Sequence, residues 1–328
     1  MTLAVDIILV ISGIAVLLLG GDFLVRGAVA LANRAGISPL IVGLTVVAFG
    51  TSAPEMVVSA AAAISNAPGL AVGNIVGSNI ANIFLVLGLP AILMPMATRA
   101  PGVGRNALIA LAASVLFIAL SWDRMLDLTD GLILGALIIV YVIYLAIGAA
   151  RAKDDPVIAE LTEAATVGDV PVSTGRMLFF LLVGIVALPI GANLIVEGAS
   201  DIAALLGVSD AIIGLTIIAF GTSLPELATA AVAAMKRHSE VAIGNVIGSN
   251  IFNIFAVGGI TGISAGLIRG GAPIAQEFFV LDFWVMLAAA VIAAVLVLTR
   301  RPIARVTGAV LFLGYCGYIA ALAYTSLS

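Results

Sequence analysis

The sequence is organised around two copies of one segment. Residues 43–55 read GLTVVAFGTSAPE, and residues 214–226 read GLTIIAFGTSLPE. A second pair follows at the same shift of 171 residues, with GNIVGSNIANI at 73–83 and GNVIGSNIFNI at 244–254. Over the whole repeated region, 22 of 41 aligned positions are identical, Thr, Ser, Pro, Glu and Asn among them. Shared apolar composition does not produce identities of these polar types, so the chain contains an internal repeat.

The composition is that of a protein embedded in lipid. Of 328 residues, 62% are hydrophobic and only 10% are charged, and the mean hydropathy is +1.27. A soluble domain carries about 25% charged residues, so this chain lacks the polar residues to cover a water-soluble surface. Alternating apolar and polar strands are absent, which disfavours a membrane β-barrel and predicts an all-α integral membrane protein.

Ten apolar stretches are long enough to cross a bilayer, for which a helix needs about 20 residues. The ten expected transmembrane helices are residues 4–32, 37–65, 70–96, 104–121, 128–150, 176–203, 209–235, 240–267, 278–299 and 306–326.

The repeat divides these helices into two halves of five. We expect a first repeat at 1–150, a polar linker at 151–173 and a second repeat at 174–328. Because five is an odd number, the second half enters the membrane from the opposite side, so the two five-helix repeats are inverted. Inverted repeats are common in secondary transporters, where the substrate binds near the membrane midplane between the repeats. The first helix of each repeat lies outside the motif helices and is our candidate for a moving gate.

The distribution of Lys and Arg predicts the orientation. With the N-terminus outside, the outer loops hold only Arg124 and Arg269, and the other 12 of the 14 basic residues lie on the inner side. The opposite orientation reverses this ratio. We therefore expect a multi-pass protein of the cell membrane with an external N-terminus and a cytosolic linker.

Each copy of the motif places a glutamate, Glu55 or Glu226, near the middle of a membrane helix. An ionisable residue at that depth is costly and is a candidate functional residue. Two neighbouring carboxylates repel each other, and burial disfavours their charged forms. A bound divalent cation relieves both penalties, so the pair indicates a cation site.

The residues that precede each glutamate in the sequence offer further oxygen ligands. Thr51 and Ser52 lie four and three residues before Glu55, on the same helix face. Pro54 and its counterpart Pro225 lack an N–H group, so we expect both helices to break or kink and to free main-chain carbonyls. Carboxylate, hydroxyl and carbonyl oxygens are ligands for Ca²⁺ or Na⁺. The sequence offers no His/Cys cluster for a transition metal.

The following helix of each repeat adds a stripe of amides and hydroxyls at every fourth residue. Glycines on the same face allow the helices to approach closely, which brings the stripe toward the glutamate. From these stripes we expect ion contacts by Ser78, Asn82, Ser249 and Asn253. We expect packing or helix-to-helix bonding by Asn74, Asn79, Asn245 and Asn250.

These paired motifs, GTSxPE followed by GNxxGSNIxNI, resemble the α-repeats of the cation/Ca²⁺ antiporter superfamily, and in particular the prokaryotic members of its Na⁺/Ca²⁺ exchanger branch. The resemblance covers nearly the whole chain and implies a secondary-active antiporter that exchanges Na⁺ for Ca²⁺ by alternating access. It implies that Glu55 and Glu226 hold Ca²⁺ and share in binding Na⁺. The further ligands that it implies are Thr51, Ser52, Thr222, Ser223, the carbonyls of Ala48 and Ala219, and Ser78, Asn82, Ser249 and Asn253.

Other functions are weighed against this one. The H⁺-coupled branch of the superfamily typically has a GNxxE-type motif in place of GTSxPE, which favours Na⁺ over H⁺ coupling, with a Ca²⁺/H⁺ or other divalent cation/H⁺ antiporter as the alternative. K⁺-dependent members carry Asp near the position of Asn253, so the amide disfavours K⁺ coupling. An intramembrane hydrolase lacks a nucleophile and base near the motif. A passive channel would pass Ca²⁺ without a counter-ion gradient.

The expected partners follow from this reading. Ca²⁺ and Na⁺ are the substrates and the lipid bilayer is the environment. We expect no enzymatic activity, no cofactor, no nucleic acid and no obligate protein partner.

Overall fold

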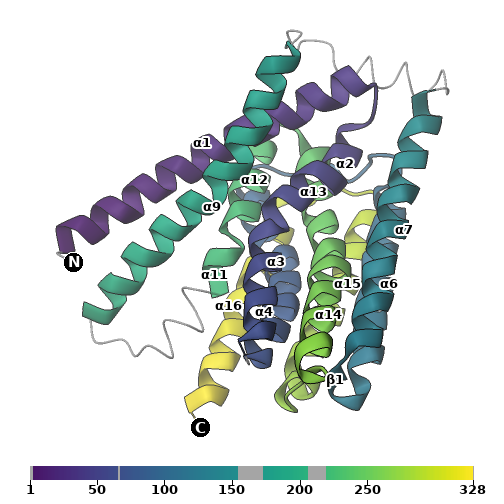
Figure 1. The fold of residues 1–328 in the computed structure, drawn as a ribbon. Coiled ribbons are helices and arrows are strands. Elements are labelled where there is room, and N and C mark those ends of the chain that lie inside the picture. Colours follow the sequence, from purple (N-terminus) through teal and green to yellow (C-terminus); the bar gives the residue numbers. More distant parts are fainter. Residues whose placement is uncertain (1–2, 66, 154–172, 206–218, 328) are drawn as a thin grey trace.

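The computed structural model describes residues 3–65, 67–153, 173–205 and 219–327, and these are almost entirely helical (Figure 1). Within them, nine helices are long and apolar enough to cross a membrane. Their bounds agree with nine of the expected stretches to within about three residues. The remaining stretch, 209–235, is described only from residue 219 onward.

Several membrane segments are built from consecutive helical pieces, including short π-helices labelled η. The elements of the first half are α1 (Leu3–Ala35), α2 (Pro39–Val42), η1 (Gly43–Val47), α3 (Ala48–Ile64), α4 (Pro68–Ala81), η2 (Asn82–Val86), α5 (Gly88–Leu93), α6 (Val103–Leu120), the 3-10 turn η3 (Ser121–Asp123), β1 (Met125–Leu126) and α7 (Leu128–Lys153). Those of the second half are α9 (Thr174–Leu205), α11 (Ala219–Thr222), α12 (Leu224–Met235), α13 (Ser239–Phe252), η5 (Asn253–Val257), α14 (Gly258–Arg269), β2 (Ala272–Pro273), η6 (Phe278–Asp282), α15 (Phe283–Leu298) and α16 (Arg305–Leu327).

The first helices of the two repeats, α1 and α9, lie side by side and slant across the upright helices (Figure 1). A Cβ atom added to Gly13 would lie 2.8 Å from the carbonyl oxygen of Gly191, and one added to Gly27 would lie 2.9 Å from the main-chain nitrogen of Leu181. Residue numbers rise along α1 as they fall along α9, so the two helices are antiparallel. Because they are equivalent elements of the repeat, the two repeats are inverted.

Close backbone contacts join the two halves elsewhere as well. A Cβ on Gly131 of α7 would lie 2.7 Å from the carbonyl carbon of Gly262 in α14. One on Gly308 of α16 would approach Ala91 and Ile92 of α5 to 2.9 Å. These are equivalent helix pairs, because the last helix of each half packs on a motif helix of the other. The halves are therefore intertwined, and each completes its packing only with the other.

Short main-chain pairings connect the loops of the two halves. Strand β1 pairs antiparallel with β2, with Met125 opposite Pro273. Met96 forms an isolated antiparallel bridge with Ile303, through N–H···O bonds of 3.1 and 2.8 Å. The two pairings join equivalent loops of the inverted repeats, so each end of the helix bundle carries one of them.

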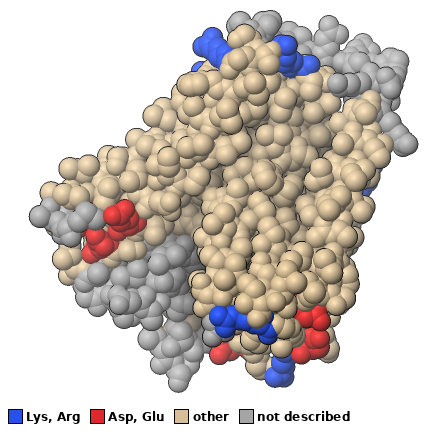
Figure 2. All heavy atoms as spheres, in the orientation of Figure 1, with Lys and Arg blue, Asp and Glu red and all other residues tan. Residues whose placement is uncertain are grey.

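The described surface is largely apolar, as lipid contact requires. In the visible face, charged side chains lie at the top, at the bottom and at the left end of the molecule, and the broad surface between them is uncharged (Figure 2). Large side chains such as Val57 and Leu267, each 70% exposed, point outward from the bundle. The protein is a multi-pass membrane protein.

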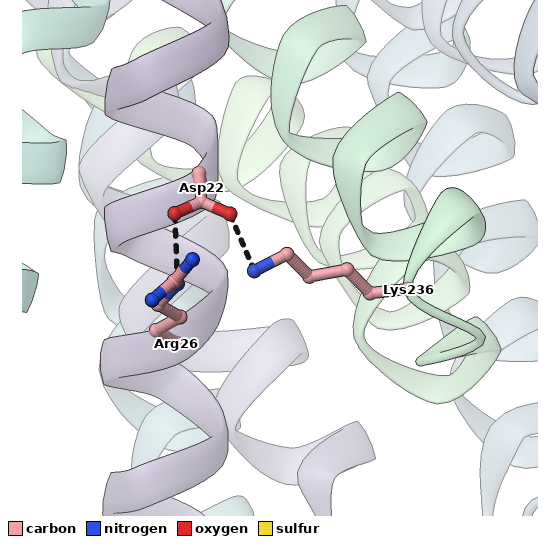
Figure 3. Close-up of polar contacts among 3 residues, drawn as sticks. All are labelled: Asp22, Arg26 and Lys236. Atoms are coloured by element: carbon pink, nitrogen blue, oxygen red, sulfur yellow. Dashed lines mark ion pairs between the residues drawn. The ribbon is translucent and has the colours of Figure 1, made fainter.

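An ion-pair cluster ties α1 to the end of α12. Asp22 and Arg26 lie one helical turn apart on α1, and Arg26 Nε lies 2.7 Å from Asp22 Oδ2. The structure adds Lys236, whose ammonium group pairs with the other carboxylate oxygen (Figure 3). All three side chains are partly exposed, so we expect the cluster to contribute only about 0–1 kcal/mol to stability.

Candidate functional site

The two motif glutamates lie deep inside the bundle. Glu55 belongs to α3 and is 1% exposed, whereas Glu226 lies in the first turn of α12 and is fully buried. Ser52, which lies three residues before Glu55 on α3, bonds to Glu226, so the two glutamates belong to one buried region. The inverted packing of α3, α4, α12 and α13 thus brings together two carboxyl groups that are 171 residues apart in the chain.

Hydroxyl groups from both repeats surround Glu226. Ser52 of α3 donates a hydrogen bond of 3.1 Å to Glu226 Oε1, and Ser249 of α13 lies 3.5 Å from the same oxygen. The hydroxyl of Thr51 lies 3.5 Å from that of Ser249. Two residues expected at the site from the sequence, Ser52 and Ser249, therefore meet at one carboxylate oxygen, and the hydroxyl of Thr51 lies beside that of Ser249.

A further group of buried oxygen atoms has no hydrogen-bond partner in the described part of the protein. It comprises both carboxylate oxygens of Glu55, Oε2 of Glu226, the hydroxyl of Ser223 and the side-chain amides of Asn82 and Asn253. Burying such groups without a partner costs free energy. A hard cation takes about six to eight oxygen ligands, so this set of oxygens fits one well.

Not every expected ligand faces a glutamate. Ser78 donates to the amide oxygen of Asn74 at 3.4 Å, and Thr222 lies 3.5 Å from the same atom. The carbonyl oxygen of Ala48 lies 3.4 Å from the hydroxyl oxygen of Thr51. Ala219 opens α11, at the edge of the described residues.

The two prolines act differently. In the second repeat the helix is interrupted as expected, because α11 ends at Thr222 and α12 begins at Leu224. In the first repeat the expected break at Pro54 is absent, since α3 runs unbroken through this residue. Pro54 removes only the helical hydrogen bond to the carbonyl of Gly50, and a membrane helix that is packed against its neighbours can continue through such a residue.

Sequence reasoning did not anticipate the π-helical turns. One begins at Asn82 and its equivalent begins at Asn253, so both central amides stand where the helix widens. Such turns often occur at functional sites. Since the hydrophobic pattern here fits an ordinary helix, only the repetition of NIFLV and NIFAV at 82–86 and 253–257 hints at a shared feature.

The site offers oxygen ligands rather than sulfur or imidazole. No group of three or more His, Cys, Asp or Glu residues suited to a metal ion occurs in the described ranges. The only cysteine in the sequence, Cys316, is exposed on α16. Oxygen donors of this kind suit Ca²⁺ and Na⁺ rather than a transition metal.

Comparison with known proteins agrees with this architecture. A family model described as sodium/calcium exchanger protein matches residues 5–147 and 176–324. The chain belongs to this family. Its members are cation/Ca²⁺ antiporters, and the family is a transporter family rather than a class of enzymes. The resemblance drawn from the two motifs is therefore confirmed at the level of the family.

Two curated relatives of this family member match over nearly their whole length. The putative antiporter CaxA of Alkalimonas amylolytica is 39% identical, covering 95% of this chain and 96% of its own. The sodium/calcium exchanger MaX1 of Methanosarcina acetivorans is 33% identical, covering 98% and 99%.

A solved structure confirms the fold of two inverted repeats. The sodium-calcium exchanger NCX_Mj, soaked with zero Na⁺ and Ca²⁺, superimposes with a TM-score of 0.81 at 30% sequence identity. The match covers 97% of this chain and 99% of that one.

Proposed function

We propose that this family member exchanges Na⁺ for Ca²⁺ across the cell membrane by alternating access. The observation that carries the proposal is the pair of buried carboxylates, Glu55 and Glu226, among unpartnered hydroxyl and amide oxygens. Two negative charges balance one Ca²⁺, and the same oxygens suit Na⁺. The two ions compete for overlapping ligands, so exchange follows when the empty site does not reorient readily.

The proposed ligands are those of both repeats. The carboxylates hold Ca²⁺, and hydroxyl, amide and carbonyl oxygens complete the coordination of either ion. The set is Glu55, Glu226, Thr51, Ser52, Thr222, Ser223, Ala48, Ala219, Ser78, Asn82, Ser249 and Asn253. One Ca²⁺ neutralises the two carboxylates, whereas Na⁺ ions in excess of these two charges leave the loaded site with a net positive charge. We therefore expect transport to be electrogenic and independent of K⁺.

Ca²⁺ uptake into proteoliposomes tests the coupling ion. Vesicles loaded with Na⁺ and diluted into Na⁺-free medium should accumulate Ca²⁺, and an ionophore that dissipates the Na⁺ gradient should stop them. Vesicles with a pH gradient and no Na⁺ should not exceed protein-free liposomes. Uptake that follows the pH gradient alone would instead identify a Ca²⁺/H⁺ antiporter, and uptake without either gradient would identify a channel.

The orientation is a further proposal, with the N-terminus outside and the 151–173 linker in the cytosol. The linker lies mostly outside the described residues, so the argument rests on charge. On the face seen in Figure 2, the charged side chains of described residues at the end where α9 begins are Lys and Arg, and both signs occur at the opposite end. Positive residues concentrate on the cytoplasmic side of membrane proteins.

Cysteine labelling tests this orientation. In a Cys316→Ser background, a Glu160→Cys variant should resist an impermeant thiol reagent in intact cells and react after permeabilisation. Asp123→Cys, in the exposed turn η3 between α6 and α7, is the control and should react from outside. The reverse pattern would invert the topology.

Asn253 offers a test of the centre of the site. Changing it to Asp adds a third carboxyl group to a buried pair, and both burial and like charges favour its protonated form. Asn253→Asp should therefore keep part of the Ca²⁺ transport and make it more pH-dependent. Asn253→Ala removes only a neutral dipole, so it should weaken apparent Ca²⁺ affinity about tenfold or less.

Flux across a pH series for the wild type and both Asn253 variants checks this prediction. Identical pH profiles and unchanged ion affinities in all three proteins would place Asn253 outside the ion site.

A further inference from the structure

A hydrogen bond crosses between the repeats beside each glutamate. Asn245 of α13 accepts a 3.1 Å bond at Oδ1 from the hydroxyl of Thr51 in α3. Its Nδ2 lies 3.5 Å from the main-chain carbonyl oxygen of Glu226, a residue of its own repeat. Asn245 is fully buried, so no water competes for either contact.

The first repeat has the equivalent arrangement. Asn74 of α4 donates from Nδ2 to the main-chain carbonyl of Glu55 at 3.3 Å. Its Oδ1 lies 3.5 Å from the hydroxyl of Thr222 in the opposite repeat. The two arrangements are related by the 171-residue shift, and together they link the motif helices of both repeats through contacts that include the main-chain carbonyls of both glutamates.

The orientation of each amide follows from chemistry. A main-chain carbonyl can only accept a hydrogen bond, so the amide must turn its NH₂ group toward it. The amide oxygen then faces the threonine, and a hydroxyl that contacts an amide oxygen must donate its proton. The threonine oxygen keeps its lone pairs for another partner, and a cation is a partner that needs lone pairs.

We infer that Asn74 and Asn245 are positioning residues, each of which orients the threonine ligand of the opposite repeat toward the transported cation. Groups that bond to a ligand side chain fix its direction and strengthen its binding, and removing them typically weakens metal affinity about 10- to 100-fold. The inference rests on the proposed function, because it needs a cation at the site. It adds that the threonine ligand of each repeat is oriented by an asparagine of the other repeat.

Plain packing is the alternative role for these amides, since Asn side chains commonly bond membrane helices together. The two roles predict different effects of removing the amide. A packing amide affects folding and acts on all ligands alike. A positioning amide affects the Ca²⁺ dependence of transport and acts through one threonine only.

A double-mutant cycle in proteoliposomes distinguishes these roles. Asn245→Ala and Thr51→Val should each raise the apparent KM for Ca²⁺ about tenfold, with the maximal rate changed less than about twofold. The double variant should also show about a tenfold increase, because the second change removes an interaction that is already lost.

The mismatched pair is the control. Asn245→Ala combined with Thr222→Val should raise KM about a hundredfold, the product of the two separate effects. The reciprocal cycle of Asn74 with Thr222 should show the same sign of coupling but a smaller one, because Asn74 also accepts a bond from Ser78. If Thr51→Val proves inactive, Thr51→Ser can replace it in the test. Serine retains the hydroxyl that Asn245 would orient, so Asn245→Ala should still raise the KM for Ca²⁺ about tenfold in the Thr51→Ser background.

Independent effects in the crossed pair, or equal coupling in the mismatched pair, would overturn the assignment. So would an Asn245→Ala protein whose KM is unchanged and whose folded yield alone falls. A wild-type protein that carries no Ca²⁺ under any gradient would overturn the proposed function itself, whereas wild-type uptake with an uncoupled crossed pair overturns the positioning role alone.

Discussion

Replacing Glu55 by Gln is expected to abolish Ca²⁺ transport while leaving the protein folded, and replacing Glu226 by Gln should do the same. Each change removes one of two buried charges that balance a divalent ion, and the isosteric amide keeps the volume. Removing one partner of a buried pair of opposite charges, here a carboxylate that binds Ca²⁺, costs about 3–5 kcal/mol. That corresponds to more than a hundredfold in Ca²⁺ affinity.

Na⁺-driven Ca²⁺ uptake in proteoliposomes measures this effect, and size-exclusion chromatography reports folding. Glu240→Gln is a matched control, because Glu240 lies in the first turn of α13 near the membrane surface and contributes nothing to the proposed site. It should transport Ca²⁺ at close to the wild-type rate. Near-normal uptake by either motif variant would refute the assignment of the two glutamates.

A bulky residue at Gly131 is expected to destabilise the protein strongly. Even a single Cβ atom at this position would collide with the main chain of α14, at Gly262, Ile263 and the carbonyl oxygen of Gly259. No rotamer change relieves a clash with backbone atoms, so α7 and α14 must separate. Overpacking of this kind costs about 1–3 kcal/mol and sometimes more, and we expect Gly131→Leu to reach or exceed the upper figure.

The same substitution elsewhere on α7 provides the control. An added Cβ at Gly148 meets nothing within 4 Å, so Gly148→Leu should change stability by no more than about 0.5 kcal/mol. Thermal unfolding in detergent, followed by light scattering, compares the two variants. Equal melting temperatures would show that the α7–α14 contact does not limit stability.

The spans and the inversion of the repeats could be predicted from the sequence because they depend on local composition and on an odd helix count. The convergence of Glu55 and Glu226 could be predicted from the repeat. What could not be predicted is which group bonds to which. The periodicity of Ser249 indicates its helix face, but the partner on that face, Glu226, follows only from the relative rotation of packed helices.

Local irregularities of the helices and single ion pairs could not be predicted from the sequence either. Pro54 and Pro225 stand in nearly identical motifs, yet only the second lies beside a helix break. Proline removes one hydrogen bond in both, so the outcome depends on surrounding contacts. Lys236 is similar, because its pairing with Asp22 requires α12 to end against the side of α1.

The close glycine contacts between the halves also govern the order of events during synthesis. Gly13, Gly27 and Gly131 meet their partners on segments made more than a hundred residues later. At about 5–20 residues per second, each of these glycines is made roughly 7 to 36 seconds before its partner. During that interval their backbone grooves face lipid. We therefore expect the newly synthesised first half not to be a finished domain. The packing of the two halves against each other can begin only when α9 enters the membrane.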